Sequence, residues 1–315
     1  MPKRKNKKRN PVADRLLYVA VRVAAMFMYM VPHKANYVTA RILGDILYRF
    51  YGRGPHRATE HVRLSYPDWD EDRIRHVARE SMRSMAYLAI EMLFTPKLIT
   101  QTQWRKRIQL VNMEETLRIL LEHKTGAIML TGHFGNWEVV GYTMAALGLP
   151  TYSVARRQDN PLLDEFIFGV RERAGQVILD KRGATARIPE LMANKETVCF
   201  IADQDAGRKG VFVDFFGRKA STYKSIALLA MQHEVPIVVG YAKRLGARYK
   251  FEIGVCDVIH PADWADADHP VKYITQRYTA ALEAIIRTAP EQYLWTHRRW
   301  KHRPKGQEQP ADGIA

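Results

Sequence analysis

The feature that most constrains the fold is an alternation, from about residue 107 onward, of short apolar runs with helical stretches. Four of these runs are GAIMLT (126–131), LPTYSVA (149–155), QVILD (176–180) and TVCFIAD (197–203). Helices are expected from Trp137, after Pro161 and in IPELMA. Neighbouring parallel strands need crossover connections, which are usually helices, so the alternation predicts an α/β fold with a mixed, mostly parallel sheet flanked by helices.

The segments on either side complete the expected order of elements. After residue 223, a helix (KSIALLAMQH) leads to PIVVGYAKR and YKFEIGVCD, two strands joined by a tight turn at 245–247, and a last helix covers about 270–288. Residues 34–95 have apolar positions at helical spacing. The sheet is therefore expected to be preceded by a helical region.

The first apolar run of the chain, LLYVAVRVAAMFMYMV at 16–31, is interrupted only by Arg22. About twenty residues are needed to cross a bilayer core, so this run predicts a membrane-associating helix that lies in the interface or inserts as a shallow anchor. A buried helix is the alternative, and no small-residue cleavage site of a signal peptide follows the run. We expect a basic disordered tail (1–11), this helix (12–33), one α/β domain with a helical N-terminal part (34–305) and a second tail (306–315).

The positive charge is concentrated at the two ends of the chain. The 315 residues include 49 Lys+Arg and 33 Asp+Glu, a formal net charge of +16 at pH 7. Residues 1–9 hold six of the basic residues and 297–305 hold five, without any acid, so the remainder is at only +5. Such ends suggest a phosphate-bearing partner, which can be nucleic acid, anionic lipid or a phosphorylated carrier; a solvated tail is the alternative at the N-terminus.

Composition excludes several classes of protein. With 47% hydrophobic residues the chain can build a packed core, so it is not wholly disordered. Its two cysteines, Cys199 and Cys256, exclude a disulfide scaffold and a Cys-rich metal site, and they fit a reducing, cytoplasm-facing location. Cys199 lies within an apolar run and is expected to be a buried small hydrophobe.

The most informative segment is TGHFGNWEVVG (131–141), directly after an expected strand. His133 stands where the strand ends, and Asn136 is a suitable N-cap for a helix whose first turn contains Glu138. Ligands of α/β sheets bind beyond the carboxyl ends of the strands. A histidine beside a carboxylate is a general-base arrangement, although this spacing alone is also compatible with a surface or core role.

The string around His133 resembles the HX4E motif of the lysophospholipid acyltransferase superfamily, and GHFGNWE is similar to the lipid A biosynthesis lauroyl/myristoyl acyltransferase family. Three further blocks are similar to that family and occur in order: ARRQDNPLLDEF (155–166), ADQDAGRKGVFVDFFGR (202–218) and EQYLWTHRRWK (291–301). Together with the N-terminal apolar segment, the resemblance covers most of the chain.

The resemblance implies transfer of a fatty acyl chain from an acyl carrier protein or coenzyme A thioester to a hydroxyl of a membrane glycolipid, with a lipid A precursor as the expected acceptor. His133 would deprotonate this hydroxyl and Glu138 would orient His133, without a metal, another cofactor or a covalent enzyme intermediate. The expected location is the cytoplasmic face of the bacterial inner membrane, with peripheral or monotopic attachment to an anionic lipid surface.

Two alternatives remain open at this point. A relative could acylate another lipid, such as a phosphatidylinositol mannoside, an ornithine lipid or a glycerol lipid. A nucleic-acid-binding protein would fit the charge but explains neither the apolar segment nor the GHFGNWE block, so we expect no nucleic-acid partner.

Further side chains are expected to contact substrate. The Arg156 fork can hold a phosphate or carbonyl oxygen, and Arg157 is the alternative for this role. Asp203 and Asp205 follow a strand and should reach the crevice of His133; with no Gly-rich phosphate loop nearby, they are expected to order the site rather than to bind magnesium. The full substrate-binding set is Arg156, Asn160, Asp203, Gln204, Asp205, Arg298 and Arg299. The expected acyl-chain pocket is Phe134, Trp137, Phe212, Phe215 and Phe216, for which a packed loop core is the alternative.

Overall fold

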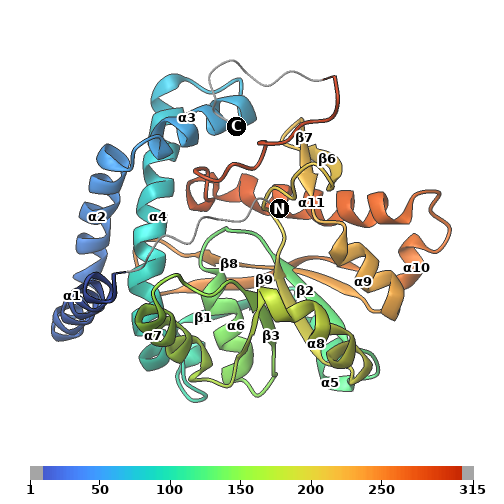
Figure 1. Cartoon of the computed structure of the whole chain (residues 1–315), viewed down its shortest axis with the longest axis horizontal. Coiled ribbons are helices and arrows are strands. Elements are labelled where there is room, and N and C mark those ends of the chain that lie inside the picture. The colour runs from blue at the N-terminus through green and yellow to red at the C-terminus, as the bar shows by residue number, and fades with distance from the viewer. Residues whose placement is uncertain (1–9, 307–315) are drawn as a thin grey trace.

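The chain is built around a seven-stranded sheet with the strand order β1-β9-β8-β2-β5-β3-β4. The computed structural model describes residues 10–306, and Figure 1 shows the sheet with helices around it. Its strands are β1 (Ile108–Val111), β2 (Ala127–Thr131), β3 (Tyr152–Ala155), β4 (Val177–Asp180), β5 (Thr197–Ile201), β8 (Ile237–Arg244) and β9 (Phe251–Ile259). All neighbours pair in parallel except β8 and β9, which are antiparallel. The expected α/β fold with a mostly parallel sheet is confirmed.

Helical crossovers explain the parallel pairing. The helices of this part are α5 (Glu114–Glu122), α6 (Trp137–Ala146), α7 (Pro161–Glu172), α8 (Lys181–Ala193), α9 (Ser225–His233), α10 (Pro261–Trp264) and α11 (Pro270–Thr288), with short 3₁₀ turns η1 (Trp104–Lys106) and η2 (Pro290–Gln292). Central strand β2 is buried at four of its five positions, which accounts for its continuous apolar sequence.

The chain after Gly210 forms a small separate hairpin. Strands β6 (Val211–Phe215) and β7 (Arg218–Thr222) pair in antiparallel fashion. Phe216 and Gly217 between them both have positive φ (52° and 68°), as a two-residue turn of the mirror-image type requires. The ring of Phe216 is nevertheless buried in the core.

From residue 10 onward, four α-helices precede the sheet: α1 (Pro11–Met30), α2 (Asn36–Phe50), α3 (Gly54–Ser65) and α4 (Glu71–Leu98). Ion pairs of Arg83 with Asp45, at 2.7 Å, join α4 to α2. A Cβ atom at Gly44 would lie 2.4 Å from the Cα atom of Arg83, so only glycine permits this approach of the two helices.

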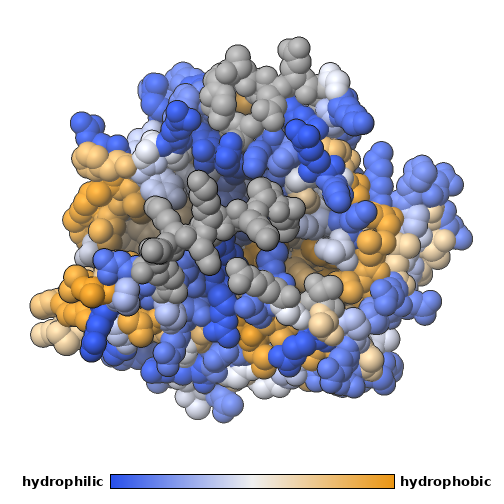
Figure 2. All heavy atoms as spheres, viewed as in Figure 1, coloured by the Kyte–Doolittle hydropathy of each residue, from blue (hydrophilic) through white to orange (hydrophobic). Residues whose placement is uncertain are grey.

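Helix α1 is poorly buried. Among its described residues only Ala25 is buried, and the apolar side chains of Leu16, Leu17 and Phe27 are more than half exposed. Figure 2 shows apolar surface on the left of the molecule, where α1 and α2 lie in Figure 1. Within residues 10–306, every helix is too short or too polar to cross a bilayer.

Candidate active site

The loop between β2 and α6 carries His133 and is held in place by backbone hydrogen bonds. Gly135 N–H donates to Gln292 O (3.0 Å), and Asn136 N–H donates to Ala242 O (2.9 Å). Gly135 has φ +59°, and a Cβ atom there would lie 1.9 Å from the carbonyl oxygen of Ala242. Asn136 caps α6 as expected, because its side chain accepts from Val139 N–H. Leu294 N–H donates to His133 O, so the C-terminal segment braces the loop from a second side.

The carboxylate that contacts His133 is that of Asp203. The Nδ1 atom of His133 lies 2.7 Å from Asp203 Oδ1, and the backbone N–H of His133 donates to Asp203 Oδ2 at 2.9 Å. Burial alone would raise the pKa of the Asp203 carboxyl, but His133 and then His297 hold that pKa well below its usual range. An ionised carboxylate only accepts hydrogen bonds, so His133 Nδ1 carries a proton, and in the neutral form of the ring Nε2 presents the lone pair.

Glu138 lies elsewhere, and this differs from the sequence expectation. Its carboxylate accepts from Arg171 of α7 at 2.7 and 2.5 Å and from the indole N–H of Trp137 at 3.1 Å. The physical reason is the start of α6 at Trp137: the first helical turn directs Glu138 toward α7, whereas the end of neighbouring strand β5 brings Asp203 to His133. The prediction that Glu138 contacts His133 is therefore wrong, and Asp203 takes that place.

Two further side chains lie on the His133 ring. The ring of His297 is 4.3 Å from that of His133, centroid to centroid. Burial, and then the charge of His133, lower the pKa of His297 to about 4, so His297 is neutral at pH 7. Gln204 is exposed, and its side-chain nitrogen lies 3.5 Å from His133 Nε2. The sequence pattern does not single out His297, whose only signal is its place in EQYLWTHRRWK.

The cluster also contains potential metal ligands. One donor atom each of His133, Asp203 and His297 lie within 4.8 Å of one another in the described part of the chain. Both oxygens of Asp203 are engaged by His133, so the observed contacts are those of a histidine–aspartate dyad.

The second acid of the Asp-Gln-Asp string holds the C-terminal segment. Asp205 Oδ2 lies 2.6 Å from Nδ1 of His302. Arg299 is almost fully buried and donates to Ser221 O and Thr222 Oγ1, both at 2.6 Å, whereas Arg298 is exposed. The blocks at 202–218 and 291–301 thus come together at His133, with Arg299 as a brace between them.

The Arg-x-x-x-Asn-Pro block contacts neither His133 nor Asp203 directly. Arg156 is exposed and pairs with Asp159 at 3.0 Å, while Arg157 pairs with Asp164 at 2.9 Å. The Asn160 side-chain oxygen caps α7, and its nitrogen donates to Asp14 O of α1. The hydrogen bonds of Asn160 are therefore used in holding α7 and α1.

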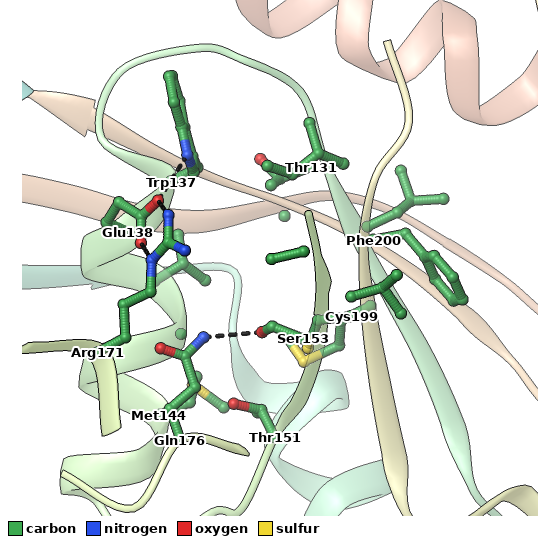
Figure 3. Close-up of a pocket in the computed structure, with 18 of the residues that line it drawn as sticks. Thr131, Trp137, Glu138, Met144, Thr151, Ser153, Arg171, Gln176, Cys199 and Phe200 are labelled. Carbon is green, nitrogen blue, oxygen red and sulfur yellow. Dashed lines mark hydrogen bonds and ion pairs between the residues drawn. The ribbon is translucent and has the colours of Figure 1, made fainter. Parts of the chain in front are cut away.

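An apolar cavity opens beside the loop, between the sheet and helices α6 and α7 (Figure 3). Its volume is about 90 Å³. Trp137 and Thr131 lie at one end, and Gln176, which donates to Ser153 Oγ at 2.7 Å, lies with Thr151 at the other. Because the ring of Trp137 is 4.8 Å from that of His133, the first end adjoins the dyad.

Of the five residues expected around an acyl chain, only Trp137 lines this cavity. Phe134, Phe215 and Phe216 are buried in a core cluster with Tyr293 and Trp295. Phe212 lies on β6 opposite Ser221 and is not among the lining residues. The phenylalanines are placed by the hairpin packing on the C-terminal segment, so they form a loop core, which was the alternative.

Comparison with known proteins decides the family. The family model described as bacterial lipid A biosynthesis acyltransferase matches residues 1–302. The chain belongs to this family of acyltransferases. It is 27% identical to the lipid A biosynthesis lauroyltransferase of Escherichia coli K12, over 87% of this chain and 88% of the relative. It is 29% identical to a lipid A biosynthesis acyltransferase of Haemophilus influenzae, over 78% and 77% of the two chains. A phosphatidylinositol mannoside acyltransferase of Mycolicibacterium smegmatis is 30% identical over 36% of this chain.

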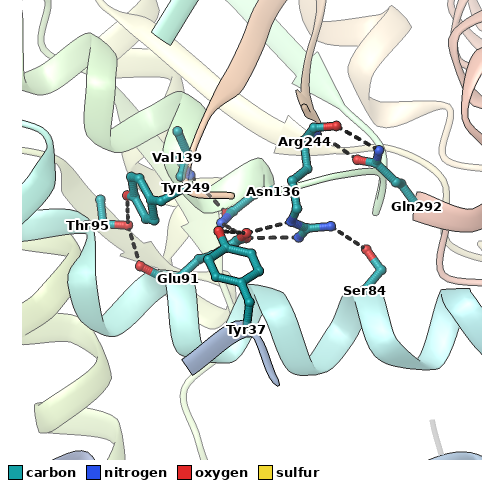
Figure 4. Close-up of polar contacts among 9 residues, drawn as sticks. All are labelled: Tyr37, Ser84, Glu91, Thr95, Asn136, Val139, Arg244, Tyr249 and Gln292. Atoms are coloured by element: carbon teal, nitrogen blue, oxygen red, sulfur yellow. Dashed lines mark hydrogen bonds and ion pairs between the residues drawn. The ribbon is translucent and has the colours of Figure 1, made fainter. Parts of the chain in front are cut away.

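In this member of the lipid A acyltransferase family, a buried ionic network supports the loop of His133 (Figure 4). The Arg244 guanidinium contacts both oxygens of Glu91, at 2.5 and 2.8 Å. Glu91 also accepts from the side chain of Asn136 (2.9 Å) and from the hydroxyl of Tyr37 on α2 (2.7 Å). A buried ion pair that loses one partner costs about 3–5 kcal/mol, so the network fixes the cap of α6 firmly. Its members come from distant parts of the sequence, and apart from Asn136, expected as an N-cap, no local pattern identified them.

Proposed function

We propose that this protein transfers a fatty acyl chain from an acyl thioester to a hydroxyl group of a lipid A precursor, with His133 as the general base and Asp203 as its orienting carboxylate. One observation carries the proposal: the dyad, in which Nδ1 of His133 contacts Asp203 and leaves Nε2 for a substrate, adjoins the Trp137 end of an apolar cavity. A neutral imidazole held in one tautomer is suited to removing a proton from an acceptor hydroxyl.

The reaction balances without any covalent bond to the protein. His133 Nε2 takes the hydroxyl proton as the oxygen attacks the thioester carbonyl, and Asp203 stabilises the resulting imidazolium. The Gln204 amide, beside Nε2, is placed to donate to the oxyanion of the tetrahedral intermediate. When that intermediate collapses, the carbon–sulfur bond breaks and His133 returns the proton to the thiolate. Acyl carrier protein and coenzyme A both supply such a thioester.

The acyl chain occupies the cavity of Figure 3 in this proposal. The cavity walls include Val140, Met144, Ile178 and Phe200, and each methylene buried against such side chains contributes roughly 0.8 kcal/mol. Gln176 and Thr151 close the far end, so the depth of the cavity limits the length of the chain. Glu138 and Arg171 form part of the wall near Trp137, which makes them positioning residues for the cavity mouth rather than for His133.

The exposed apolar faces of α1 and α2 attach the protein to the cytoplasmic face of the inner membrane, as a peripheral or monotopic enzyme. Helix α1 exposes Leu16, Leu17 and Phe27, and α2 exposes Ile42 and Phe50. Each such side chain stabilises the bound state by about 1.5–3 kcal/mol when fully buried in the lipid. The expected basic tail covers 1–11, and all but its last two positions lie outside the described residues. Its six basic residues would add electrostatic attraction to anionic lipid.

A second acceptor class is supported by one comparison. The partial match to a phosphatidylinositol mannoside acyltransferase makes other glycolipids candidate acceptors as well. The test is to incubate purified full-length protein with acyl carrier protein or coenzyme A thioesters and a bacterial lipid extract, and to identify acylated products by mass spectrometry. We expect a phosphorylated glucosamine lipid to gain the mass of one acyl chain. Acylation of a glycerolipid alone would refute the assigned acceptor, and thioester hydrolysis without any lipid product would refute transfer.

A further inference from the structure

Three arginines around the C-terminal segment, Arg57, Arg218 and Arg303, have no carboxylate partner among residues 10–306. Arg57 of α3 donates to Thr296 O (3.1 Å), and Arg218 of β7 donates to Ser65 Oγ (2.9 Å) and, more distantly, to His61 O. For Arg303, the described residues contain no hydrogen-bond acceptor and no ion-pair partner within reach. The Nε atoms of all three are buried without an acceptor.

Three other shielded arginines in the described part of the chain pair with carboxylates, whereas buried Arg299 donates to Ser221 O and Thr222 Oγ1. Arg83 pairs with Asp45, Arg171 with Glu138, and Arg244 with Glu91. Charges withdrawn from water are normally paired, because an isolated buried charge costs several kcal/mol. Burial, and then Arg303, lower the pKa of Arg218 to about 9, which still leaves its guanidinium charged at pH 7.

The three arginines meet one stretch of chain, 296–303: Arg57 contacts Thr296, Arg218 contacts Trp300, and Arg303 belongs to the stretch itself. The Arg218 guanidinium stacks 3.5 Å from the ring centroid of Trp300, and Trp300 lies against His61 of α3. Figure 1 shows the C-terminal segment passing between α3 and β7, and Figure 2 shows mostly hydrophilic surface there. Thr296, the partner of Arg57, directly precedes His297, whose ring contacts His133. The site thus adjoins the reacting atoms.

We propose that Arg57, Arg218 and Arg303 bind a phosphate group of the acceptor lipid, an inference that rests on the proposed function. Guanidinium forks match phosphate oxygens, and a bound phosphate would supply the missing negative partner. The acceptor is favoured over the donor because the acyl cavity is lined from α6 and α7, whereas Arg57 and Arg218 belong to α3 and β7, which Figure 1 shows at the other end of the molecule. Acyl chain and acceptor phosphate would then approach the dyad from two sides.

The first experiment measures binding without turnover. Inorganic pyrophosphate is titrated into the full-length protein while its melting temperature is recorded, since a ligand that binds only the folded state raises it. We expect a rise for wild type and for the control Arg118→Gln, an exposed arginine on α5, and a much smaller rise for Arg57→Gln and Arg218→Gln. Arg218→Lys retains the charge and should keep part of the rise. An equal rise in all variants would overturn the site.

The second experiment separates acceptor from donor. Transfer is measured with a phosphorylated glycolipid and with the same lipid after removal of its phosphates. Losing a charge-assisted hydrogen bond should raise the acceptor KM of Arg218→Gln and Arg303→Gln roughly tenfold to a hundredfold, with the donor KM unchanged. With the dephosphorylated lipid, wild type and variants should be alike. A raised donor KM would assign the arginines to the donor and overturn the proposal. If the wild-type protein binds pyrophosphate but transfers no acyl chain, the enzyme function alone is refuted.

Discussion

Replacing Asp203 by asparagine removes the negative charge of the side chain and leaves its shape almost unchanged. The Asp203 carboxylate is 2% exposed and accepts both the Nδ1–H and the backbone N–H of His133. Asparagine can accept only one of these bonds with its oxygen, and its NH₂ group then faces a donor. The His133 ring is left either in the wrong tautomer or without its orienting partner.

The size of the effect follows from the charge that Asp203 provides. Unit charges about 4 Å apart interact by ~4 kcal/mol at an effective dielectric constant of 20, and each 1.36 kcal/mol off the barrier is a factor of ten in rate. If most of this interaction develops as His133 becomes charged, Asp203→Asn should lower kcat by about two to three powers of ten. The same substitution in the serine protease triad, a known case, costs a factor of about 10⁴.

The assay is the initial rate of acyl transfer between pH 5 and 9, with melting temperatures as a check on folding. The alkaline-plateau rate of Asp203→Asn should fall, and its pH profile should move to lower pH because the imidazolium has lost its partner. Asp257→Asn is the control, since Asp257 pairs with Arg277 on α11, away from the dyad. Glu138→Gln should keep the wild-type profile. A folded Asp203→Asn enzyme with wild-type kcat, or a shifted profile in Glu138→Gln, would refute the assignment.

Three further predictions concern His297, the cavity and the membrane face. The pKa of His297 is about 4 in the folded protein and about 6.5 in the unfolded chain. Between these two pH values the unfolded chain binds more protons than the folded protein. The free energy of unfolding therefore falls as the pH is lowered, and the loss reaches ~3 kcal/mol below pH 4. His297→Gln should lessen this acid loss in urea unfolding, and an unchanged slope would contradict the burial of a neutral ring. A Cβ at Gly141 would lie 2.3 Å from Gln176 Nε2, so Gly141→Leu should fill the cavity and shift kcat/KM toward shorter acyl donors; equal losses at all chain lengths would contradict the cavity assignment. The double variant Leu17→Glu, Phe27→Glu should no longer float with anionic vesicles, and undiminished flotation would mean that other surfaces bind lipid.

The sequence predicted the scaffold well because its signals are local. Apolar runs with helices between them identified β2, β3, β4 and β5, and Asn136 marked the start of α6. Position after a strand also led to His133 and Asp203, since the carboxyl ends of parallel strands share one edge of the sheet.

What the sequence did not predict depends on the order of strands in space. Asp203 follows His133 by seventy residues, yet β5 pairs directly with β2, and this neighbour relation made Asp203 rather than Glu138 the contact of His133. His297 and the arginines at 57 and 218 come together only because the C-terminal segment runs between α3 and β7. The cavity walls are side chains of ordinary core type, so composition could not distinguish them from a packed interior.

The most direct test of the central claim is a paired measurement on one reaction. Thiol released from the acyl thioester and acyl chains gained by the lipid acceptor are counted together, for wild type and for His133→Gln. General-base transfer predicts one thiol for each acylated lipid in wild type, and a loss of both products by about two to four powers of ten in a folded His133→Gln protein. Acylated lipid formed at the wild-type rate by His133→Gln would contradict the claim.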